Sequence, residues 1–336
     1  GGQTRIAISG LKAHLFQQRL LRGHVMERKI WLNHLDGTSI NPVPSKLHDL
    51  GMDYSQICNQ VSEYLGGNCK VILTSSGIEA VNHAIKGVAF RQKNKVAIKV
   101  EEGASLAMRN TVKWLRKNGF NEHGEISITC MSAVDSATGE IYNIEKSDDS
   151  IMIVDGCAAM GRIEFNMEHI DLLALQFDGF GALAFNPRIR IDPLIHGGGE
   201  QGGRRGGHIP AILLQQFSLP LDVPSKLDSF LLTQVEASGF KINAPKNRAF
   251  GIINVSLDGV SAESVLIDLA AAGVYMSASS GCTTSTGIPD ASLLRLGLSE
   301  DEALSSLRIS ISENTTESEI VEGLAALNEV VARFRN

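Results

Sequence analysis

Short apolar runs rich in β-branched residues alternate with helical stretches up to about Pro220. Strands are predicted at 70–74, 95–100, 125–131, 150–155, 171–176 and 181–185, and helices at 78–90 and 105–117. Strand–helix–strand units join parallel neighbours through right-handed crossovers, so this alternation predicts a mainly parallel sheet. We therefore expect an α/β fold.

The alternation loosens after about Pro220, and a different order of elements follows. Strands are predicted at 250–257 and 307–311, with helices from Ser261, from the capping box at Ser299, and from Thr316 to about Phe334. This order predicts a small α+β domain. We divide the chain into an N-terminal arm at 1–30, a large α/β domain at 31–235 and a small C-terminal α+β domain at 236–336.

Composition limits the classes of partner. The net charge is −6, from 31 basic and 37 acidic residues, which is not the basic footprint of a nucleic-acid binder. We predict no direct nucleic-acid binding. The N-terminal region has no apolar stretch long enough for a membrane span or a signal peptide, so we expect a cytoplasmic protein that is not membrane-bound.

The cysteines and histidines show no metal or disulfide pattern. Five cysteines, an odd number, contain no CxxC pair and no zinc spacing, which fits a reducing compartment. His196 and His208 have no metal-ligand companions nearby in the sequence, so no metal site is predicted. Cys157, at a buried strand end, is expected to lie in the core.

Six stretches, in order, resemble the cysteine desulfurase branch of the class V aminotransferases. They are WLNHLDGTSINPVP at 31–44, LTSSGIEAVNHAIKGVAF at 73–90, IVDGCAAMGRIEFNMEHIDLLAL at 153–175, DPLIHGGGEQGGRRGGHIPAI at 192–212, SASSGCTTSTG at 277–287 and LLRLGLSEDEALSSLRISISENTTESEI at 293–320. The resemblance covers about residues 31–335. It implies a fold-type I, pyridoxal-phosphate-transferase-like fold. It also implies a homodimer, because the family's Gly-rich loop, here 196–208, reaches into the partner subunit's site.

Pyridoxal phosphate chemistry needs a lysine for the Schiff base, an acid opposite the pyridine nitrogen, and a phosphate cup. The resemblance assigns the acid to Asp155. It places further, vestigial cofactor contacts at the start of a helix and in the Gly-rich loop, at Ser76, Gly77, Arg205 and His208.

Arg308 matches the position of the family's arginine for the substrate carboxylate. Bidentate pairing explains why an arginine is used there. A salt bridge between the domains is the alternative role for this side chain.

The Schiff-base lysine is missing. In the alignment with the family, the lysine position falls on Gly179, or on Asp178 if the alignment gap is moved. No lysine lies between Lys146 and Lys226. Neither residue can form an imine, and an acidic Asp178 near the phosphate would repel the dianion. Other family contacts are changed as well, at Glu102 or Gly103, 135–139, Ala158, Ile78 and His208.

The family's persulfide cysteine lies in the loop that here contains Cys282. Strict alignment puts Thr284 at the cysteine position and Cys282 two residues early, in a shortened loop. Cys282 is thus a candidate persulfide cysteine, and a small, semi-buried structural residue is the alternative.

Three functions follow from the resemblance. The first is a pseudoenzyme without pyridoxal phosphate chemistry, a binding or scaffolding subunit with a protein partner in a sulfur-transfer or nucleotide or nucleic-acid modification system. The second is an active pyridoxal-phosphate desulfurase or lyase with rearranged ligands, which needs a lysine such as Lys241 or Lys246. The third is a persulfide or iron–sulfur relay through Cys282. A weaker variant has the vacated pocket binding another small anion or amino acid.

Overall fold

The computed structural model describes residues 54–335 except 94, 121–123, 208, 210–213, 215–216 and 279–288. The predicted arm at 1–30, the stretch at 31–44, His208 and Cys282 lie outside the described residues.

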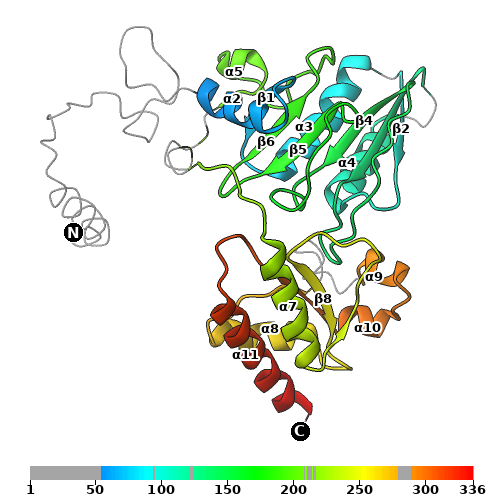
Figure 1. Ribbon diagram of the computed structural model, residues 1–336. Coiled ribbons are helices and arrows are strands. Elements are labelled where there is room, and N and C mark those ends of the chain that lie inside the picture. The colour runs from blue at the N-terminus through cyan, green and yellow to red at the C-terminus, as the bar shows by residue number, and fades with distance from the viewer. Residues whose placement is uncertain are drawn as a thin grey trace, which may run out of the picture. The chain divides into compact units, whose positions relative to one another are not determined.

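A six-stranded sheet is formed by the first six strands of the described chain (Figure 1). Its strands are β1 (Lys70–Thr74), β2 (Val96–Val100), β3 (Ile126–Ser132), β4 (Ser150–Asp155), β5 (Leu172–Gln176) and β6 (Gly181–Phe185). The order is β1-β6-β5-β4-β3-β2. Strands β2 to β5 are parallel, and β6 runs antiparallel to both β5 and β1. The mainly parallel sheet predicted from the alternation is therefore confirmed, with strand bounds within two residues of those expected.

Helices cover both faces of this sheet, and the apolar residues of the strands point alternately to each. Helices α3 (Gly77–Gln92) and α4 (Leu106–Lys117) pack on one face, in a core cluster with strand residues such as Ile153 and Leu183. Helix α2 (Tyr54–Tyr64) packs on the other face. Sheets buried on both faces need continuous apolar strands, which explains the runs in the sequence.

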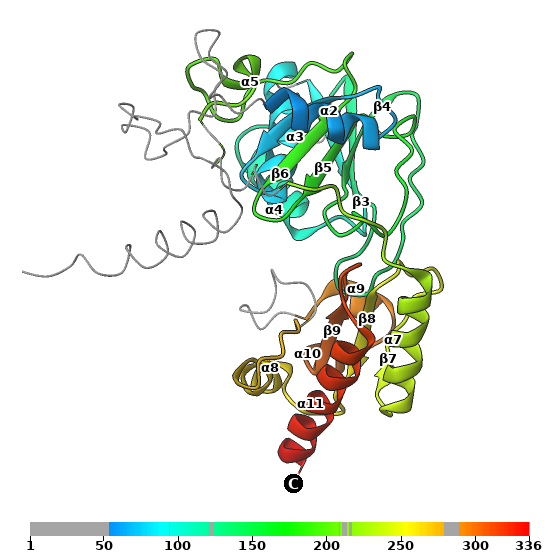
Figure 2. The same ribbon diagram turned by 60° about the vertical axis from the view of Figure 1, so that its left-hand side comes forward.

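A separate three-stranded antiparallel sheet lies in the C-terminal part of the chain (Figure 2). It consists of β7 (Lys241–Ile242), β8 (Ile252–Ser256) and β9 (Ser306–Ser310), in that order. The helices in this part of the chain are α7 (Ser225–Ala237), α8 (Ala262–Ala271), α9 (Ala291–Arg295), α10 (Glu300–Leu304) and α11 (Glu317–Arg335). Helix α11 contacts both α7 and α8.

The start signals of the C-terminal helices act as predicted. Ser299 and Glu302 form the reciprocal capping box that begins α10, and Thr316 and Glu319 exchange the same two bonds before α11. Helix α7 packs into the core cluster of the three-stranded sheet and contains residue 235, where we place the domain boundary. The division into domains stays a prediction.

Arginine side chains join the two sheets by donating to backbone carbonyls. Arg162 follows β4, and it donates to the carbonyls of Phe250 at 2.5 Å and Ile311 at 2.9 Å. Arg308 on β9 donates to the carbonyl of Ser136 at 2.9 Å. No helix in the described part of the chain has the length and hydropathy to cross a bilayer.

Candidate functional site

A pocket of about 460 Å³ lies at the carboxyl edge of the six-stranded sheet. Strands β1, β3, β4 and β5 run in the same direction, so their carboxyl ends meet there. Gly77 follows β1, and Ser132, Asp155 and Gln176 are the last residues of β3, β4 and β5. Ligands of open α/β sheets bind in this kind of crevice, which makes the pocket the candidate functional site.

The rest of the wall comes from two segments far apart in the sequence. They are residues 102–107 with Arg109, and residues 289–292 with Arg295. Apolar side chains, including Ile78 and Leu106, contribute much of the surface.

Asp155 lies in this pocket, at the end of a strand, as the resemblance implies. It is 9% exposed, and its Oδ1 accepts the backbone N–H of Cys157 at 3.0 Å. Cys157, expected in the core, is partly buried and lines the pocket as well. Burial, and then the charge of Asp155, raise the pKa of the Cys157 thiol well above its ordinary value, so the thiol is the favoured form.

The N-terminus of α3 is closed by side chains of this chain. The N–H of Gly77 donates to Gln176 Oε1 at 2.6 Å, and the N–H of Glu79 donates to Ser76 Oγ at 3.2 Å. The N–H of Ser75 donates to Glu79 Oε2 at 2.8 Å. A helix N-terminus binds phosphate through such free N–H groups, and these three are already engaged.

Arg205 is not directed at the pocket opening. Its guanidinium makes a bidentate pair with Glu79 at 2.8 and 3.1 Å, and the side chains are only 7% and 10% exposed. Desolvation alone would raise the pKa of Glu79. The hydrogen bonds from Arg205 and Ser75 outweigh it and lower that pKa. The charge of Arg205 is therefore neutralised within the same chain.

The position of the family lysine lies on a tight hairpin between β5 and β6. The N–H of Phe177 donates to the Phe180 carbonyl at 2.8 Å, so Asp178 and Gly179 are the two turn residues. Gly179 has φ +81°, in the left-handed region that glycine adopts without strain. Phe177, Phe180 and Phe217 form an aromatic cluster that holds the hairpin. Asp178 and Gly179 are exposed, and neither lines the pocket.

No lysine is among the described residues that line the pocket. Lys241 is on β7 and pairs with Glu302 at 3.1 Å, and Lys246 is exposed on the segment that follows β7. The structure does not bring either lysine to the site.

Arg308 is also absent from the lining. Besides Ser136, it donates to Ser277 Oγ at 3.1 Å, so its contacts are hydrogen bonds rather than the salt bridge considered above. Burial lowers the pKa of Arg308, and the charge of Asp135 partly offsets this effect.

Asp135 begins the turn that replaces the family's asparagine-containing turn. Its Oδ1 accepts the backbone N–H groups of Ala137 at 3.0 Å and Thr138 at 2.8 Å, and its Oδ2 accepts the hydroxyl of Ser292. The carboxylate therefore builds the turn and ties it to the lining segment that contains Ser292.

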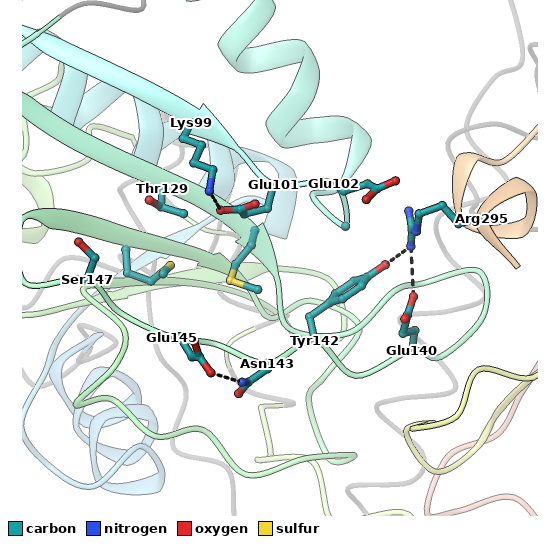
Figure 3. Close-up of a pocket in the computed structure, with 13 residues that line it drawn as sticks. Lys99, Glu101, Glu102, Thr129, Glu140, Tyr142, Asn143, Glu145, Ser147 and Arg295 are labelled. Carbon is teal, nitrogen blue, oxygen red and sulfur yellow. Dashed lines mark hydrogen bonds and ion pairs between the residues drawn. The ribbon is translucent and has the colours of Figure 1, made fainter.

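A second pocket of about 520 Å³ adjoins the first and shares Glu102, Gly103 and Arg295 with it (Figure 3). Figure 3 shows Arg295 reaching both the Tyr142 hydroxyl and Glu140, the latter at 3.1 Å. Burial is the main cause that raises the pKa of Tyr142, so this phenol stays protonated.

Lys99 on β2 is the lysine of this second pocket. Its Nζ lies 2.6 Å from Glu101, and Figure 3 shows the side chain directed at that carboxylate.

No metal cluster is present in the described part of the chain, since no three His, Cys, Asp or Glu side chains there are placed to hold an ion. The four described cysteines, Cys58, Cys69, Cys130 and Cys157, are free thiols. Burial raises the pKa of Cys130 to about 12, which keeps it unreactive.

Gln176 is the site residue that the sequence did not reveal. An amide at a strand end looks like an ordinary surface residue, and its partner, the Gly77 N–H, is 99 residues away. The one local pattern that could have indicated a structural role for Gln176 is the Asp178-Gly179 pair after it, which is typical of a two-residue hairpin.

Pyridoxal phosphate would need four kinds of group here: an acid, a phosphate cup, a lysine amine and a side chain that stacks on the ring. Asp155 fits a protonated ring nitrogen. The N–H of Gly77 is bonded to Gln176, so this N–H at the helix start is not free for a phosphate. No lysine amine and no aromatic side chain for stacking on the ring are among the described lining residues.

Comparison with known proteins identifies the family. No family model matches the chain. A probable mitochondrial cysteine desulfurase of Dictyostelium discoideum is 30% identical over 350 residues, 87% of this chain and 77% of that protein. Cysteine desulfurase IscS of Clostridium botulinum is 29% identical over 320 residues, 79% of this chain and 80% of that protein.

Solved structures show the same fold. A NifS-like protein has a TM-score of 0.69 at 20% identity, covering 98% of this chain and 97% of that one. A NifS-like protein from Rickettsia africae has a TM-score of 0.65 at 16% identity, covering 95% of each chain. The predicted fold-type I, pyridoxal-phosphate-transferase-like α/β architecture is thus confirmed. Together with the sequence identity, it shows that this chain belongs to the cysteine desulfurase family.

Proposed function

We propose that this member of the cysteine desulfurase family carries out no pyridoxal phosphate chemistry and acts as a binding or scaffolding subunit. The observation that carries this proposal is the end of β5. There Gln176 Oε1 accepts a hydrogen bond from the Gly77 N–H at 2.6 Å. The hairpin that follows has Asp178 and Gly179 where the family has its lysine. The absence of lysine from the described lining, together with the engaged Gly77 N–H, supports a binding role over catalysis.

The setting of this role follows from the family. We infer a cytoplasmic homodimer that works with a protein partner in sulfur transfer or in a nucleotide or nucleic-acid modification system. The Gly-rich segment at 196–207 supports an interface by its exposed glycines and exposed Arg204. Sedimentation velocity of the purified chain tests the dimer, and a single monomer peak at micromolar concentration would count against it.

An absorbance spectrum tests whether the chain carries out pyridoxal phosphate chemistry. The purified chain is mixed with pyridoxal phosphate, reduced with borohydride and dialysed. We expect no retained band at roughly 390–430 nm before reduction, the range of an imine-bound cofactor, and no lysine-linked pyridoxyl group by mass spectrometry afterwards. A reducible band that survives dialysis contradicts the proposal.

An active enzyme with rearranged ligands remains the second candidate, and one observation favours a particular lysine. Lys99 lines the pocket that shares Glu102 and Arg295 with the candidate site. If a reducible band appears, it is assigned to an imine on Lys99 when Lys99→Arg abolishes the band and Lys241→Arg leaves it unchanged. A persulfide or iron–sulfur relay through Cys282 is tested by alkylation of the native chain, because modification only after denaturation excludes a relay.

A further inference from the structure

A strongly basic segment runs from the second half of α3 through β2 to the end of α4. Residues 86–117 contain nine basic and two acidic residues, so their net charge is +7, whereas that of the whole chain is −6. The net charge of the chain therefore hides a local concentration of positive charge. The prediction of no direct nucleic-acid binding was made from the whole chain and does not describe this segment.

A groove of about 490 Å³ lies along α4, and every charged side chain in its described lining is basic. We call it the basic groove. Its lining is Val100 at the end of β2 and, on α4, Arg109, Val112, Lys113, Arg116 and Lys117. Positions 109, 113, 116 and 117 have the spacing of one helix face, and all four side chains are exposed. The four positive charges therefore add along one groove.

Two of these cations have no partner among the described residues. Neither Lys113 nor Lys117 forms an ion pair or a side-chain hydrogen bond within that part of the chain. Arg109 is fixed at the start of α4, where its Nε donates to the Ala104 carbonyl at 3.0 Å. A carbonyl is neutral, so this bond holds the guanidinium in place and leaves its charge. The two lysines and Arg109 thus provide the charge for an anionic ligand.

Trp114 adds an exposed aromatic side chain beside these lysines. It follows Lys113 on α4 and lies one turn before Lys117. The residue is 45% exposed, and Lys86 Nζ lies 4.6 Å from its ring centroid. This cation–π contact orients the ring, and almost half of the residue stays open to solvent.

Lysines next to an exposed aromatic ring suit a single-stranded nucleic acid. Its phosphates pair with the cations, and its unpaired bases stack on the ring. An acidic peptide has the charge but not the bases. The exposed Trp114 therefore favours a nucleic acid over an acidic protein as the occupant of the groove.

Helix α4 also connects the basic groove to the candidate pocket. Arg109 lines both, and Leu106, the first residue of α4, lines the pocket. The helix rises about 12 Å from Arg109 to Lys117. A strand that follows the groove from Lys117 therefore reaches the candidate pocket at Arg109.

We propose that the basic groove binds a single-stranded nucleic acid, whose phosphates pair with Lys113 and Lys117 and whose bases stack on Trp114. The inference deepens the proposed function and rests on it for its setting, because it names the partner of a binding subunit in a nucleic-acid modification system. It places one end of the bound strand at the candidate pocket.

Fluorescence anisotropy with the full chain measures this binding. The probes are labelled oligouridylate and oligothymidylate of about 16 nucleotides each. At least one should bind with a dissociation constant of about 10 μM or tighter at about 0.1 M salt. The logarithm of its association constant should fall with the logarithm of the salt concentration with a slope of about −2 to −3, since each phosphate contact on a single strand contributes about −0.7. The tighter probe names the source, RNA or DNA.

Lys113→Gln/Lys117→Gln should weaken binding about 25-fold at about 0.1 M salt and reduce the steepness of the slope by about 1.4, because two phosphate contacts are lost. Lys226→Gln/Lys246→Gln is the matched control. It removes the same charge from two exposed lysines outside the groove and should change the affinity less than about twofold. Circular dichroism with a thermal melt verifies the fold of both variants.

Trp114→Leu separates stacking from charge. It keeps an apolar side chain on α4 but removes the aromatic face, so binding should weaken about tenfold with the salt slope unchanged. Trp114→Phe should recover most of the affinity, because a phenyl ring still stacks on a base.

Poly-L-glutamate of matched length is the probe for an acidic protein partner. It should bind at least about tenfold more weakly than the tighter oligonucleotide, because it has no bases to stack. Equal or tighter binding of polyglutamate overturns the inference and assigns the groove to an acidic protein.

Three further results also overturn the inference. They are a failure of both oligonucleotides to bind, an equal loss of affinity in the two lysine double variants, and an unchanged affinity in Trp114→Leu. None of the probes contains an aldehyde or a pyridine ring, so none can report on pyridoxal phosphate chemistry. The binding data and the absorbance spectrum are therefore independent, and either proposal can fail without the other.

Discussion

Single residues at the end of β5 decide what this edge of the sheet can do. Gln176 bonds the first N–H of α3, and Gly179 sits at φ +81° in the turn. The N–H that would bind phosphate is thus engaged in a hydrogen bond, and the position that would carry an imine is a residue of a tight hairpin. A substitution that only restores the lysine type does not restore the geometry.

Gly179→Lys tests this at the residue scale. A lysine at φ +81° is strained, so we expect the free energy of unfolding to fall by about 1 kcal/mol, with no reducible band on addition of pyridoxal phosphate. Urea unfolding and the spectrum above measure the two effects. Asp178→Lys is the matched control, because Asp178 is not among the residues with positive φ, and its stability should change little.

A second residue-scale prediction concerns His83 on α3. The ring is fully buried, and neither nitrogen has a hydrogen-bond partner among the described residues. Desolvation lowers its pKa from 6.5, against smaller effects of the Asp192 carbonyl and Glu79. The unfolded chain therefore binds a proton more readily than the folded one, and stability is lost as the pH falls below 6.5.

His83→Leu should flatten that dependence. It removes the titrating group and two unsatisfied polar atoms, so we expect about 1 kcal/mol more stability at neutral pH and a larger gain at about pH 5.5. Urea unfolding at both pH values measures this, with the exposed His169→Leu as control. If the free energy of unfolding of His83→Leu depends on pH as steeply as that of the wild type, another group causes the dependence.

At the element scale, side chains of the Gly-rich segment hold it to β1 and α3. Gln201 accepts the Leu73 N–H at 2.7 Å and donates to the Leu73 carbonyl at 2.8 Å. β1 is an edge strand, so the amide of Gln201 supplies the bonds that a further strand would make. Arg205 adds the buried pair with Glu79.

Glu79→Gln should lower the free energy of unfolding by about 3 kcal/mol, because it leaves the buried Arg205 charge uncompensated. The double variant Glu79→Leu/Arg205→Met should recover most of this loss. The folded pKa of Glu79 lies below 4.5, so its contribution is present above that pH and disappears as the pH falls through the folded value. Denaturation at neutral pH and at about pH 3 should show the variant's deficit shrinking on acidification.

At the scale of the whole molecule, the two sheets are joined by arginines bound to backbone carbonyls. Arg162 and Arg308 donate across the joint to Phe250, Ile311 and Ser136. Burial, and then the charge of Arg308, lower the pKa of Arg162, which places two like charges near one another. The joint therefore depends on hydrogen bonds to carbonyls as well as on the ion pair between Arg295 and Glu140 at 3.1 Å.

Arg162→Met should remove two of these bonds, lower the free energy of unfolding by about 2 kcal/mol and separate the unfolding of the sheets. In a Trp31→Phe background, tryptophan fluorescence reports the first sheet through Trp114 on α4, and far-ultraviolet circular dichroism reports the whole chain. Noncoincident transitions are expected for Arg162→Met only. Arg333→Met, which removes an exposed pair with Asp268 at 3.7 Å, should cost under about 1 kcal/mol.

Much of the fold was predictable because local sequence patterns determine its strands and helix starts. The strand runs, the capping box at Ser299 and the acid at the end of β4 each depend on a few neighbouring residues. The part of the site that follows from strand ends, with Asp155 beside the start of α3, was therefore expected.

Partners distant in the sequence were not predictable. The resemblance implies a vestigial cofactor contact for Arg205 and a carboxylate ligand for Arg308, with a salt bridge as the alternative. In the structure they bond Glu79 and the Ser136 carbonyl, at separations of 126 and 172 residues. No local pattern encodes such pairs.

The sequence by itself determined the α/β architecture and the lack of a lysine between Lys146 and Lys226, since periodicity and residue identity suffice for these, and its resemblance to the family implied the acid at Asp155. Only the tertiary structure decided that Lys241 and Lys246 lie away from the pocket, that Gln176 closes the start of α3 and that Asp155 is left without a cationic partner among the described residues. Packing brings these groups together or apart, and packing depends on the whole chain.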